Sequence, residues 1–254
     1  MSKQFTGKTV LITGATGGIG QQIVRDFSLA GADVLLHTHK NTETAETLLN
    51  EIHRNGANGK MFQCDFSETN AAVQLLKQID KAAAQIDIFV NAAGLDLMTP
   101  DIAAMPFGKK IQLLFQTDVF VPIQLSKIVG KRMKDTGGGT IFFFSWNGVR
   151  YGWNTETAQL YGAAKGAVAG FSRSLAEGLP PEVRIRTLHL GWIATRWGAR
   201  TSDEFKRLGS CDSLQNRWGT PQDVSQTVLF LSSDASSFID GTAVYLDGTK
   251  RGTR

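Results

Sequence analysis

Short apolar runs alternate with longer amphipathic stretches along most of the chain. Seven of these runs are too short for independent helices and are mostly apolar at consecutive positions, which is typical of strands buried on both faces of a parallel sheet. We expect strands at Val10–Thr13, Val34–His37, Lys60–Cys64, Ile86–Val90, Thr140–Phe144, Arg184–Leu190 and Ala243–Leu246. We expect helices at Ile19–Ala30, Thr42–Asn55, Thr69–Ala84, Phe107–Asp135, Ala158–Gly178 and Gln222–Ser232.

This alternation, with short links between the elements, indicates βαβ units with right-handed crossovers. The sequence therefore predicts an α/β fold, a Rossmann-type doubly wound parallel sheet of about seven strands with helices on both faces. We find no long linker, internal repeat or low-complexity segment, so residues 1–254 are expected to form a single domain.

Composition excludes several classes of protein. Hydrophobic residues make up 42% of the chain and charged residues 20%, which is ordinary for a globular domain. The net charge of +4 is too small and too scattered to favour a nucleic-acid partner, and it fits an anionic cofactor or substrate equally well. Cys64 and Cys211 stand far apart, which argues against a disulfide framework or a cysteine-based zinc site. With no signal-peptide pattern and no membrane-spanning apolar run, we expect a cytoplasmic protein without a membrane partner.

A glycine-rich segment follows the first expected strand and opens the first expected helix. It reads Thr13-Gly14-Ala15-Thr16-Gly17-Gly18-Ile19-Gly20. A turn of this kind lets backbone N–H groups approach a pyrophosphate at a helix N-terminus, and side chains at its glycines would obstruct the ligand or the packing of the helix. Such loops also close tight turns without a ligand, but the position at a strand-to-helix junction favours binding.

The spacing Gly-x-x-x-Gly-x-Gly resembles the fingerprint of the short-chain dehydrogenase/reductase family. Further matches follow in the family's order: Asp65, Asn91-Ala92-Ala93-Gly94, Ser145, Tyr161-x-x-x-Lys165, Leu190-Gly191 with Thr195, and Asp247-Gly248. The resemblance implies a nicotinamide dinucleotide cofactor. The residues expected to bind it are Gly14, Thr16, Gly18, Ile19, Gly20, Thr38, His39, Lys40, Asp65, Phe66, Asn91, Ala92, Gly94, Tyr161, Lys165, Gly191, Ile193 and Thr195.

The end of the second strand bears on which nicotinamide cofactor is used. A carboxylate there would bond the ribose hydroxyls and repel a 2′-phosphate. Thr38 stands at this place, and His39 and Lys40 offer donors to a phosphate, so NADP(H) is favoured. NAD(H) stays possible, because the lack of an acid permits NADP without forbidding NAD. A metal site at His37-x-His39 is disfavoured by the lack of a suitable third ligand nearby in the sequence, and no metal is expected.

Tyr161 and Lys165 are four residues apart and share one face of a helix. A nearby ammonium would lower the pKa of the phenol and make it a usable acid–base group. The resemblance then implies that Tyr161 exchanges a proton with a substrate oxygen, that Lys165 also bonds the nicotinamide ribose, and that Ser145 polarises the carbonyl. Taken in isolation, Tyr161 and Lys165 could instead be an exposed pair on an amphipathic helix. Ser145 could be a strand-end serine that bonds only the backbone.

One catalytic position departs from the family. Aligning Asp118 and Pro122 with the pattern Asn-x-x-x-Pro places an Asp where the family has its fourth catalytic residue, an Asn. Asp118 can still hold a water in a proton relay, with changed electrostatics. The gap from Ser145 to Tyr161 is also a few residues longer than is typical, which enlarges the loop over the substrate.

Trp and Arg are concentrated where the family places its substrate contacts. Indole faces suit sugars or flat rings, and Arg suits carboxylate or phosphate groups, so the substrate is expected to be a polar or anionic carbonyl or alcohol, such as a sugar derivative. Packing of the Trp side chains in a lid is the alternative. The expected substrate residues are Asp96, Trp146, Asn147, Trp153, Trp192, Arg196 and Trp197, with Arg150, Tyr151 and Arg200 nearby.

Two other functions are open. A 3-oxoacyl-thioester reductase could meet an acidic carrier protein through Lys131, Arg132 and Lys134, although a solvated helix end explains these residues as well. A non-catalytic nucleotide-sensing or scaffold protein would have lost Tyr161 or Lys165, and both are present. The resemblance also implies a homo-oligomer, a dimer or tetramer, through the two long helices expected at Phe107–Asp135 and Ala158–Gly178.

Overall fold

The chain folds around one parallel sheet in the computed structural model, which describes residues 3–82, 85–195, 198, 201–239 and 241–248. The sheet has seven strands in the spatial order β3-β2-β1-β4-β5-β6-β7 within this described part. Their bounds are β1 Thr9–Thr13, β2 Asp33–Thr38, β3 Gly59–Gln63, β4 Ile88–Asn91, β5 Gly139–Trp146, β6 Val183–Leu190 and β7 Val244–Leu246. The predicted doubly wound sheet is therefore confirmed.

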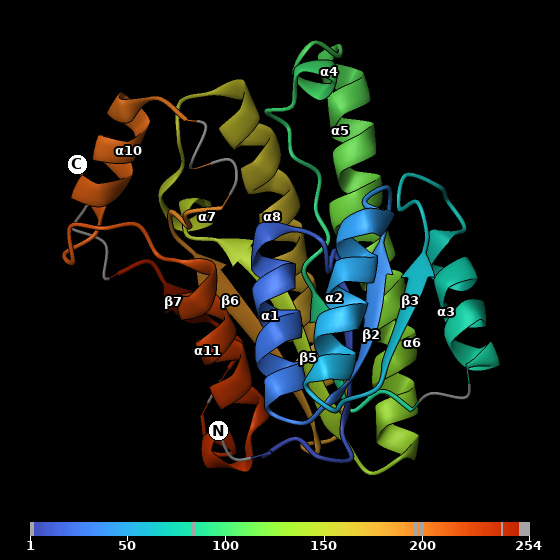
Figure 1. The fold of residues 1–254 in the computed structure, drawn as a ribbon. Coiled ribbons are helices and arrows are strands. Elements are labelled where there is room, and N and C mark those ends of the chain that lie inside the picture. The colour runs from blue at the N-terminus through green and yellow to red at the C-terminus, as the bar shows by residue number, and fades with distance from the viewer. Residues whose placement is uncertain (1–2, 83–84, 196–197, 199–200, 240, 249–254) are drawn as a thin grey trace.

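Helices cover both faces of the sheet (Figure 1). One layer holds α1 (Gly18–Leu29), α2 (Thr42–Arg54) and α11 (Pro221–Ser232), and the other holds α3 (Ala71–Lys81), α6 (Val121–Asp135) and α8 (Glu156–Glu177). Smaller elements lie at the ends of the layers: α4 (Pro100–Ala103), α5 (Phe107–Phe115), α7 (Gly148–Tyr151), α10 (Asp203–Asp212) and a 3₁₀ turn at Asp234–Ser236. Within the described residues, no helix combines the length and apolar character needed to cross a bilayer.

Alternate residues of each central strand feed two separate cores. Leu11 and Phe143 pack with the α3–α6–α8 layer, whereas Ile12 and Phe142 pack with the α1–α2–α11 layer. All four side chains are fully buried. The consecutive apolar positions in the sequence thus reflect burial of both faces of each strand.

The predicted single helix over Phe107–Asp135 is interrupted. α5 ends at Phe115, a π-helical turn spans Gln116–Phe120, and α6 begins at Val121. The cause is Pro122, which has no N–H to donate and whose ring crowds the carbonyl four residues earlier, that of Asp118. Wide turns of this kind are found where a helix absorbs such an irregularity. The turn places Asp118 within the fold rather than on a regular helix face.

The strand order reverses at β1, which lies between β2 and β4. Thr13 and Asn91 are register partners at the carboxyl ends of β1 and β4. In open α/β sheets, ligands bind in the crevice at such a switch point. The glycine-rich segment and the loop after β4 meet there.

Candidate active site

Neighbouring backbone explains why the glycines of the segment Thr13–Gly20 must be glycine. Gly14 has a φ of +64°, and a Cβ on it would lie 2.6 Å from Ala93 Cα in the loop after β4. A Cβ on Gly20 would collide with the carbonyl oxygen of Gly14, and one on Gly18 would lie 3.1 Å from Thr195 Cβ. We expected the glycines to leave room for a ligand and for the sheet; the structure shows that they also make room for the turn itself and for two other loops.

His37 ties this glycine segment to β3. Its Nδ1 accepts a hydrogen bond from the Gly14 backbone N–H (3.2 Å), and its Nε2 lies 3.0 Å from the carbonyl oxygen of Cys64. The ring stacks on Phe66 with centroids 4.1 Å apart. Burial lowers the pKa of His37 to about 4, so the ring is neutral and Nε2–H is the donor. Both nitrogens are occupied by backbone groups, and Phe66, expected at the cofactor, has its ring buried against His37 instead.

The end of β2 brings the expected cofactor residues together. Thr16 Oγ1 and Thr38 Oγ1 lie 3.1 Å apart, which joins the glycine segment to the strand end. His39 Nε2 lies 3.0 Å from the Asp65 carboxylate. The sequence did not reveal this pair. Lys40 is exposed beside it. The strand end therefore presents a hydroxyl pair, an imidazole and an ammonium, with one carboxylate facing the imidazole.

Asn91 connects three elements below the crevice. Its Nδ2 donates to Ser126 Oγ on α6 and to the carbonyl oxygen of Phe142 on β5, both at 3.1 Å. Its Oδ1 is buried, with no hydrogen-bond partner among the described residues. The next residues turn toward the glycine segment, since Ala93 N–H donates to Thr13 Oγ1 (3.3 Å), and Ala92 and Gly94 flank this contact.

The segment after β6 closes the crevice from the other side. Gly191 N–H donates to the carbonyl oxygen of Leu246 (2.9 Å), and Ile193 forms an isolated bridge with Gly219. Thr195 follows and lies against Gly18 at the start of α1. The expected cofactor residues on β1, β2, β4 and β6, and in the segments that follow these strands, therefore converge on one edge of the sheet.

This cradle fits a dinucleotide. Gly17 stands at the N-cap of α1, so no side chain caps the first N–H groups of that helix, and Ile19 lies in its first turn. Uncapped N–H groups at a helix N-terminus suit a phosphate. A Cβ at Gly14, Gly18 or Gly20 would fill the space around the turn. The residues present thus suit the group that the sequence motif implies.

A second cluster of polar side chains lies at the carboxyl end of β5. Lys165 on α8 forms a buried ion pair with Asp118, with Nζ and Oδ2 3.0 Å apart. The same Nζ lies 5.2 Å from the ring centroid of Tyr161, one helical turn away on α8. Ser145 is buried at the end of β5 and donates to the carbonyl oxygen of Lys165 at 3.1 Å. The four residues predicted to be catalytic are thus brought together.

Burial and three charged groups act on the pKa of Tyr161, and their effects oppose one another. Burial raises the pKa of Tyr161, and the carboxylates of Asp118 and Asp96 raise it further. Lys165 acts in the expected direction and lowers the pKa, but the other effects outweigh it. Burial would lower the pKa of Lys165 itself, yet Asp118 and Tyr161 raise it above its usual value. Lys165 thus acts on Tyr161 in the expected direction, while burial and the two carboxylates leave the pKa of the phenol above its ordinary value in the protein without ligands.

Several indole rings pack at or after the carboxyl ends of β5 and β6. Trp146 meets Tyr161 edge-on, with ring centroids 5.8 Å apart. Trp153 and Trp192 form a T-shaped pair at 5.7 Å, and Trp218, which sequence reasoning missed, lies 5.3 Å from Trp192. Trp192, expected at the substrate, also packs between these two rings, and its Nε1–H donates to Asp212 on α10 (3.2 Å), as the alternative of lid packing describes.

The remaining expected substrate residues divide into three groups. Asp96 is exposed in the loop after β4, where its Oδ1 accepts from Met98 N–H (2.9 Å). Asn147 is buried at the start of α7, so its side chain has little surface for a substrate. Arg196 and Trp197 lie outside the described residues.

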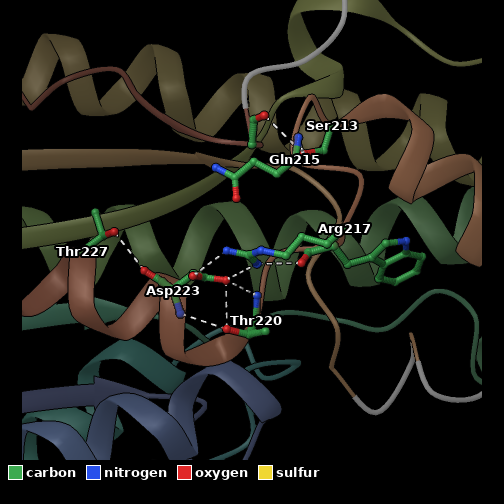
Figure 2. A network of polar contacts seen from close by, with 8 residues as sticks. Ser213, Gln215, Arg217, Thr220, Asp223 and Thr227 are labelled. Atoms are coloured by element: carbon green, nitrogen blue, oxygen red, sulfur yellow. Dashed lines mark hydrogen bonds and ion pairs between the residues drawn. The ribbon is translucent and has the colours of Figure 1, made fainter.

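A polar cavity of about 570 Å³ lies beside β7 and the start of α11, apart from the catalytic cluster. In this region Arg217 contacts both carboxylate oxygens of Asp223, at 2.7 and 3.1 Å (Figure 2). Thr220 Oγ1 caps α11 by accepting from the Asp223 backbone N–H (3.1 Å), and the Asp223 carboxylate accepts in return from the Thr220 backbone N–H (2.7 Å). The Arg217 guanidinium lowers the pKa of Asp223 to about 2. These groups neutralise one another, and the arrangement stabilises the start of α11.

Comparison with known proteins agrees with this geometry. A family model described as enoyl-(acyl carrier protein) reductase matches residues 14–249. A 2-dehydro-3-deoxy-D-gluconate 5-dehydrogenase of Pseudoalteromonas atlantica is 30% identical over 246 residues, 95% of each chain. A sorbose reductase of Schizosaccharomyces pombe is 27% identical, covering 98% of each chain.

A solved structure extends the agreement to the fold. A 7α-hydroxysteroid dehydrogenase complexed with NADH superposes with a TM-score of 0.86 at 27% identity, covering 98% of this chain and 96% of the other. Together with the glycine cradle and the cluster at the end of β5, these matches show that the chain is a nicotinamide-dependent oxidoreductase acting on alcohol or carbonyl groups and belongs to the short-chain dehydrogenase/reductase family.

Proposed function

We propose that the protein interconverts a carbonyl and a secondary alcohol on a small polar substrate, with NADP(H) preferred and Tyr161 as the acid–base group. The observation that carries this proposal is the placement of Tyr161, Lys165 and Ser145 together at the carboxyl end of β5, beside the glycine cradle. When bound, the nicotinamide supplies or accepts the hydride.

Each residue has a distinct role in the proton chemistry. Tyr161 gives its phenolic proton to the carbonyl oxygen during reduction and accepts the hydroxyl proton during oxidation. Lys165 fixes a positive charge beside the phenol and, by the family resemblance, also bonds the nicotinamide ribose. Ser145 has one hydroxyl proton, which it now donates to the Lys165 carbonyl, so it must rotate to donate to the substrate oxygen.

The preference for NADP(H) is supported by the side chains at the end of β2. Thr38 is fully buried against Thr16, so no carboxylate stands where it would repel a 2′-phosphate. Lys40 and His39 can both donate to a phosphate. Asp65 faces His39 and competes with the phosphate for that ring, which makes Lys40 the principal phosphate ligand in this proposal.

A sugar acid or related polar molecule is the proposed substrate class. The 30%-identical relative is named for an anionic sugar acid, and half-buried Trp153 and exposed Arg150 lie in the segment between Ser145 and Tyr161, where the family resemblance places substrate contacts. The acyl-carrier alternative depends on Lys131, Arg132 and Lys134, but Arg132 is held by both oxygens of Asp80, at 2.7 and 3.0 Å. The pairing with Asp80 offsets the charge of one of the three basic groups on which the acyl-carrier alternative depends. It therefore favours the small substrate.

We also propose that two copies of the chain associate through α6 and α8. Phe120 and Ile128 expose 50% and 38% of their surface beside and on α6. Gly166 and Gly170 lie one turn apart within α8, and a Cβ on Gly170 would meet nothing within 4 Å. Glycine weakens a helix interior, and nothing in the described part of the chain requires it at Gly170. A closely approaching helix of a second copy supplies that requirement.

The test compares Tyr161→Phe with Tyr245→Phe, a matched loss of one hydroxyl at an exposed tyrosine. Oxidation of NADPH is followed with a panel of sugar acids, ketoses and 3-oxoacyl thioesters. We expect Tyr161→Phe to lower kcat by at least about a hundredfold, because general acid catalysis contributes that much, and Tyr245→Phe to retain activity. Equal turnover in both variants would remove the proposed acid, and activity on acyl thioesters alone would favour the other substrate class.

A further inference from the structure

Asp118 lies deep in the fold at the π-helical turn between α5 and α6. Its residue surface is 2% exposed, and its side chain faces the carboxyl ends of β4 and β5 rather than solvent. A buried carboxylate is costly unless charge and hydrogen bonds compensate it. The contacts of Asp118 show what compensates it.

Each group that forms a hydrogen bond with the Asp118 carboxylate is a donor. Oδ1 accepts from the Leu95 backbone N–H at 2.8 Å and from Thr117 Oγ1 at 2.9 Å. Oδ2 accepts from Lys165 Nζ at 3.0 Å. A Cβ on Gly94 would lie 3.0 Å from Oδ2, so the loop after β4 closes tightly over the pair. Asp118 thus joins that loop to α8.

An Asn in this place could not make the same contacts. Its amide oxygen could accept from Leu95 and Thr117, but its NH₂ group would then face the Lys165 ammonium, donor against donor. The Asp found here presents an acceptor with a full negative charge instead. The substitution relative to the family pattern therefore changes both the partner and the net charge at Lys165.

The consequence reaches Tyr161. The charged groups that act on its phenol are Lys165 from α8, Asp118 from the π-helical turn and Asp96 from the loop after β4, while Trp146 packs on its ring. The single positive charge is already paired with one of the two negative ones. Lys165 therefore stabilises the phenolate less than an unpaired ammonium would.

We propose that Asp118 is a positioning residue that holds Lys165 in a neutral buried pair, so that this ammonium supports a Tyr161 phenolate less than an unpaired one would, which suits this site to carbonyl reduction more than to alcohol oxidation. The consequence for catalysis rests on the proposed function, in which Tyr161 is the acid–base group. The pairing itself rests on the contacts of Asp118 alone.

The experiment follows the phenolate absorbance of the protein without cofactor as the pH is raised. The chain has three tyrosines, so the signal of Tyr161 is assigned by its loss in Tyr161→Phe. We expect Asp118→Asn to move the Tyr161 midpoint to lower pH by about one unit or more, because it removes a negative charge that disfavours the phenolate and leaves the Lys165 ammonium, 5.2 Å from the ring centroid, without its carboxylate partner. Asp96→Asn removes the same charge at an exposed position and should shift the midpoint less.

The pH profile of alcohol oxidation gives a second, independent readout. In Asp118→Asn the alkaline rise in kcat should begin at lower pH by the same amount. An unchanged midpoint and profile in folded Asp118→Asn would overturn the proposal. A shifted midpoint together with full turnover in Tyr161→Phe would leave the pairing standing and overturn the proposed acid–base role instead.

A second pair of variants covers the case in which Asp118→Asn does not fold, since it leaves a buried ammonium without its partner. Lys165→Met alone keeps the carboxylate, and Lys165→Met with Asp118→Asn removes both charges. The Tyr161 midpoint should lie higher in the single variant than in the double variant. Equal midpoints would overturn the proposal.

Discussion

The proposed association through α8 can be tested at Gly170. Replacing this glycine by alanine should raise the stability of an isolated subunit but weaken a close contact between two copies. Gly170→Ala adds a methyl group where nothing lies within 4 Å in the described part of a single chain. In an isolated subunit this change should stabilise the helix by about 0.5–1 kcal/mol, which raises Tm by roughly 1–4 °C for a chain of this size. In a close helix–helix contact, the same methyl should instead cost about 1–3 kcal/mol.

We expect the second result, because a symmetric pair places the methyl on both sides of the contact. A loss of 1.4 kcal/mol weakens association about tenfold, so the variant should dissociate at a correspondingly higher protein concentration than the wild type. Sedimentation velocity over a dilution series measures the dissociation, and thermal unfolding at two concentrations measures Tm. Gly108→Ala on α5, another position where a Cβ would meet nothing within 4 Å, is the control for helix propensity.

The reasoning is refuted if Gly170→Ala leaves the oligomeric state unchanged while raising Tm as Gly108→Ala does. That outcome would mean that α8 faces solvent and that its glycine serves no contact.

Three further predictions concern the cofactor side of the crevice. His37 has a pKa of about 4 in the folded chain and 6.5 as its ordinary value, so below pH 6.5 the unfolded chain binds a proton that the folded chain does not. The free energy of unfolding should therefore fall by about 2 kcal/mol between pH 7 and pH 4.5, and urea unfolding should show a smaller fall in His37→Gln. Gly14→Ala should destabilise the protein by roughly 2–4 kcal/mol, because it combines a φ of +64° with a backbone collision, whereas Gly17→Ala should cost less than half of that in the same thermal unfolding assay. Lys40→Glu should raise KM for NADPH about tenfold, or ~1.4 kcal/mol, and leave KM for NADH within twofold; equal effects on both would remove Lys40 from the phosphate site.

The sheet and the edge at which the site forms followed from the sequence, because they depend on local patterns. Consecutive apolar residues such as Val10–Ile12 mark strands buried on both faces, and parallel strands bring their carboxyl ends to one edge. The convergence of Ser145, Tyr161 and Lys165 needed no more than this topology and the helical spacing of the last two.

Features that depend on distant partners did not follow. A helix pattern does not show that Pro122 opens a π-helical turn instead of ending the helix, nor that the turn aims Asp118 at Lys165. The net effect on the pKa of Tyr161 depends on burial and on two carboxylates from different loops. The pairing of His39 with Asp65 likewise joins residues that only the sheet brings together.

The neighbouring indoles of Trp153, Trp192 and Trp218 give this enzyme an intrinsic optical reporter. Indole emission overlaps the absorption of reduced nicotinamide, so loading of the crevice should quench the native fluorescence without any attached dye. Coupling between neighbouring rings also produces near-ultraviolet circular dichroism that depends on their mutual angle. Any shift of α10 against β6 during turnover therefore carries its own spectroscopic signal, which rapid mixing can time.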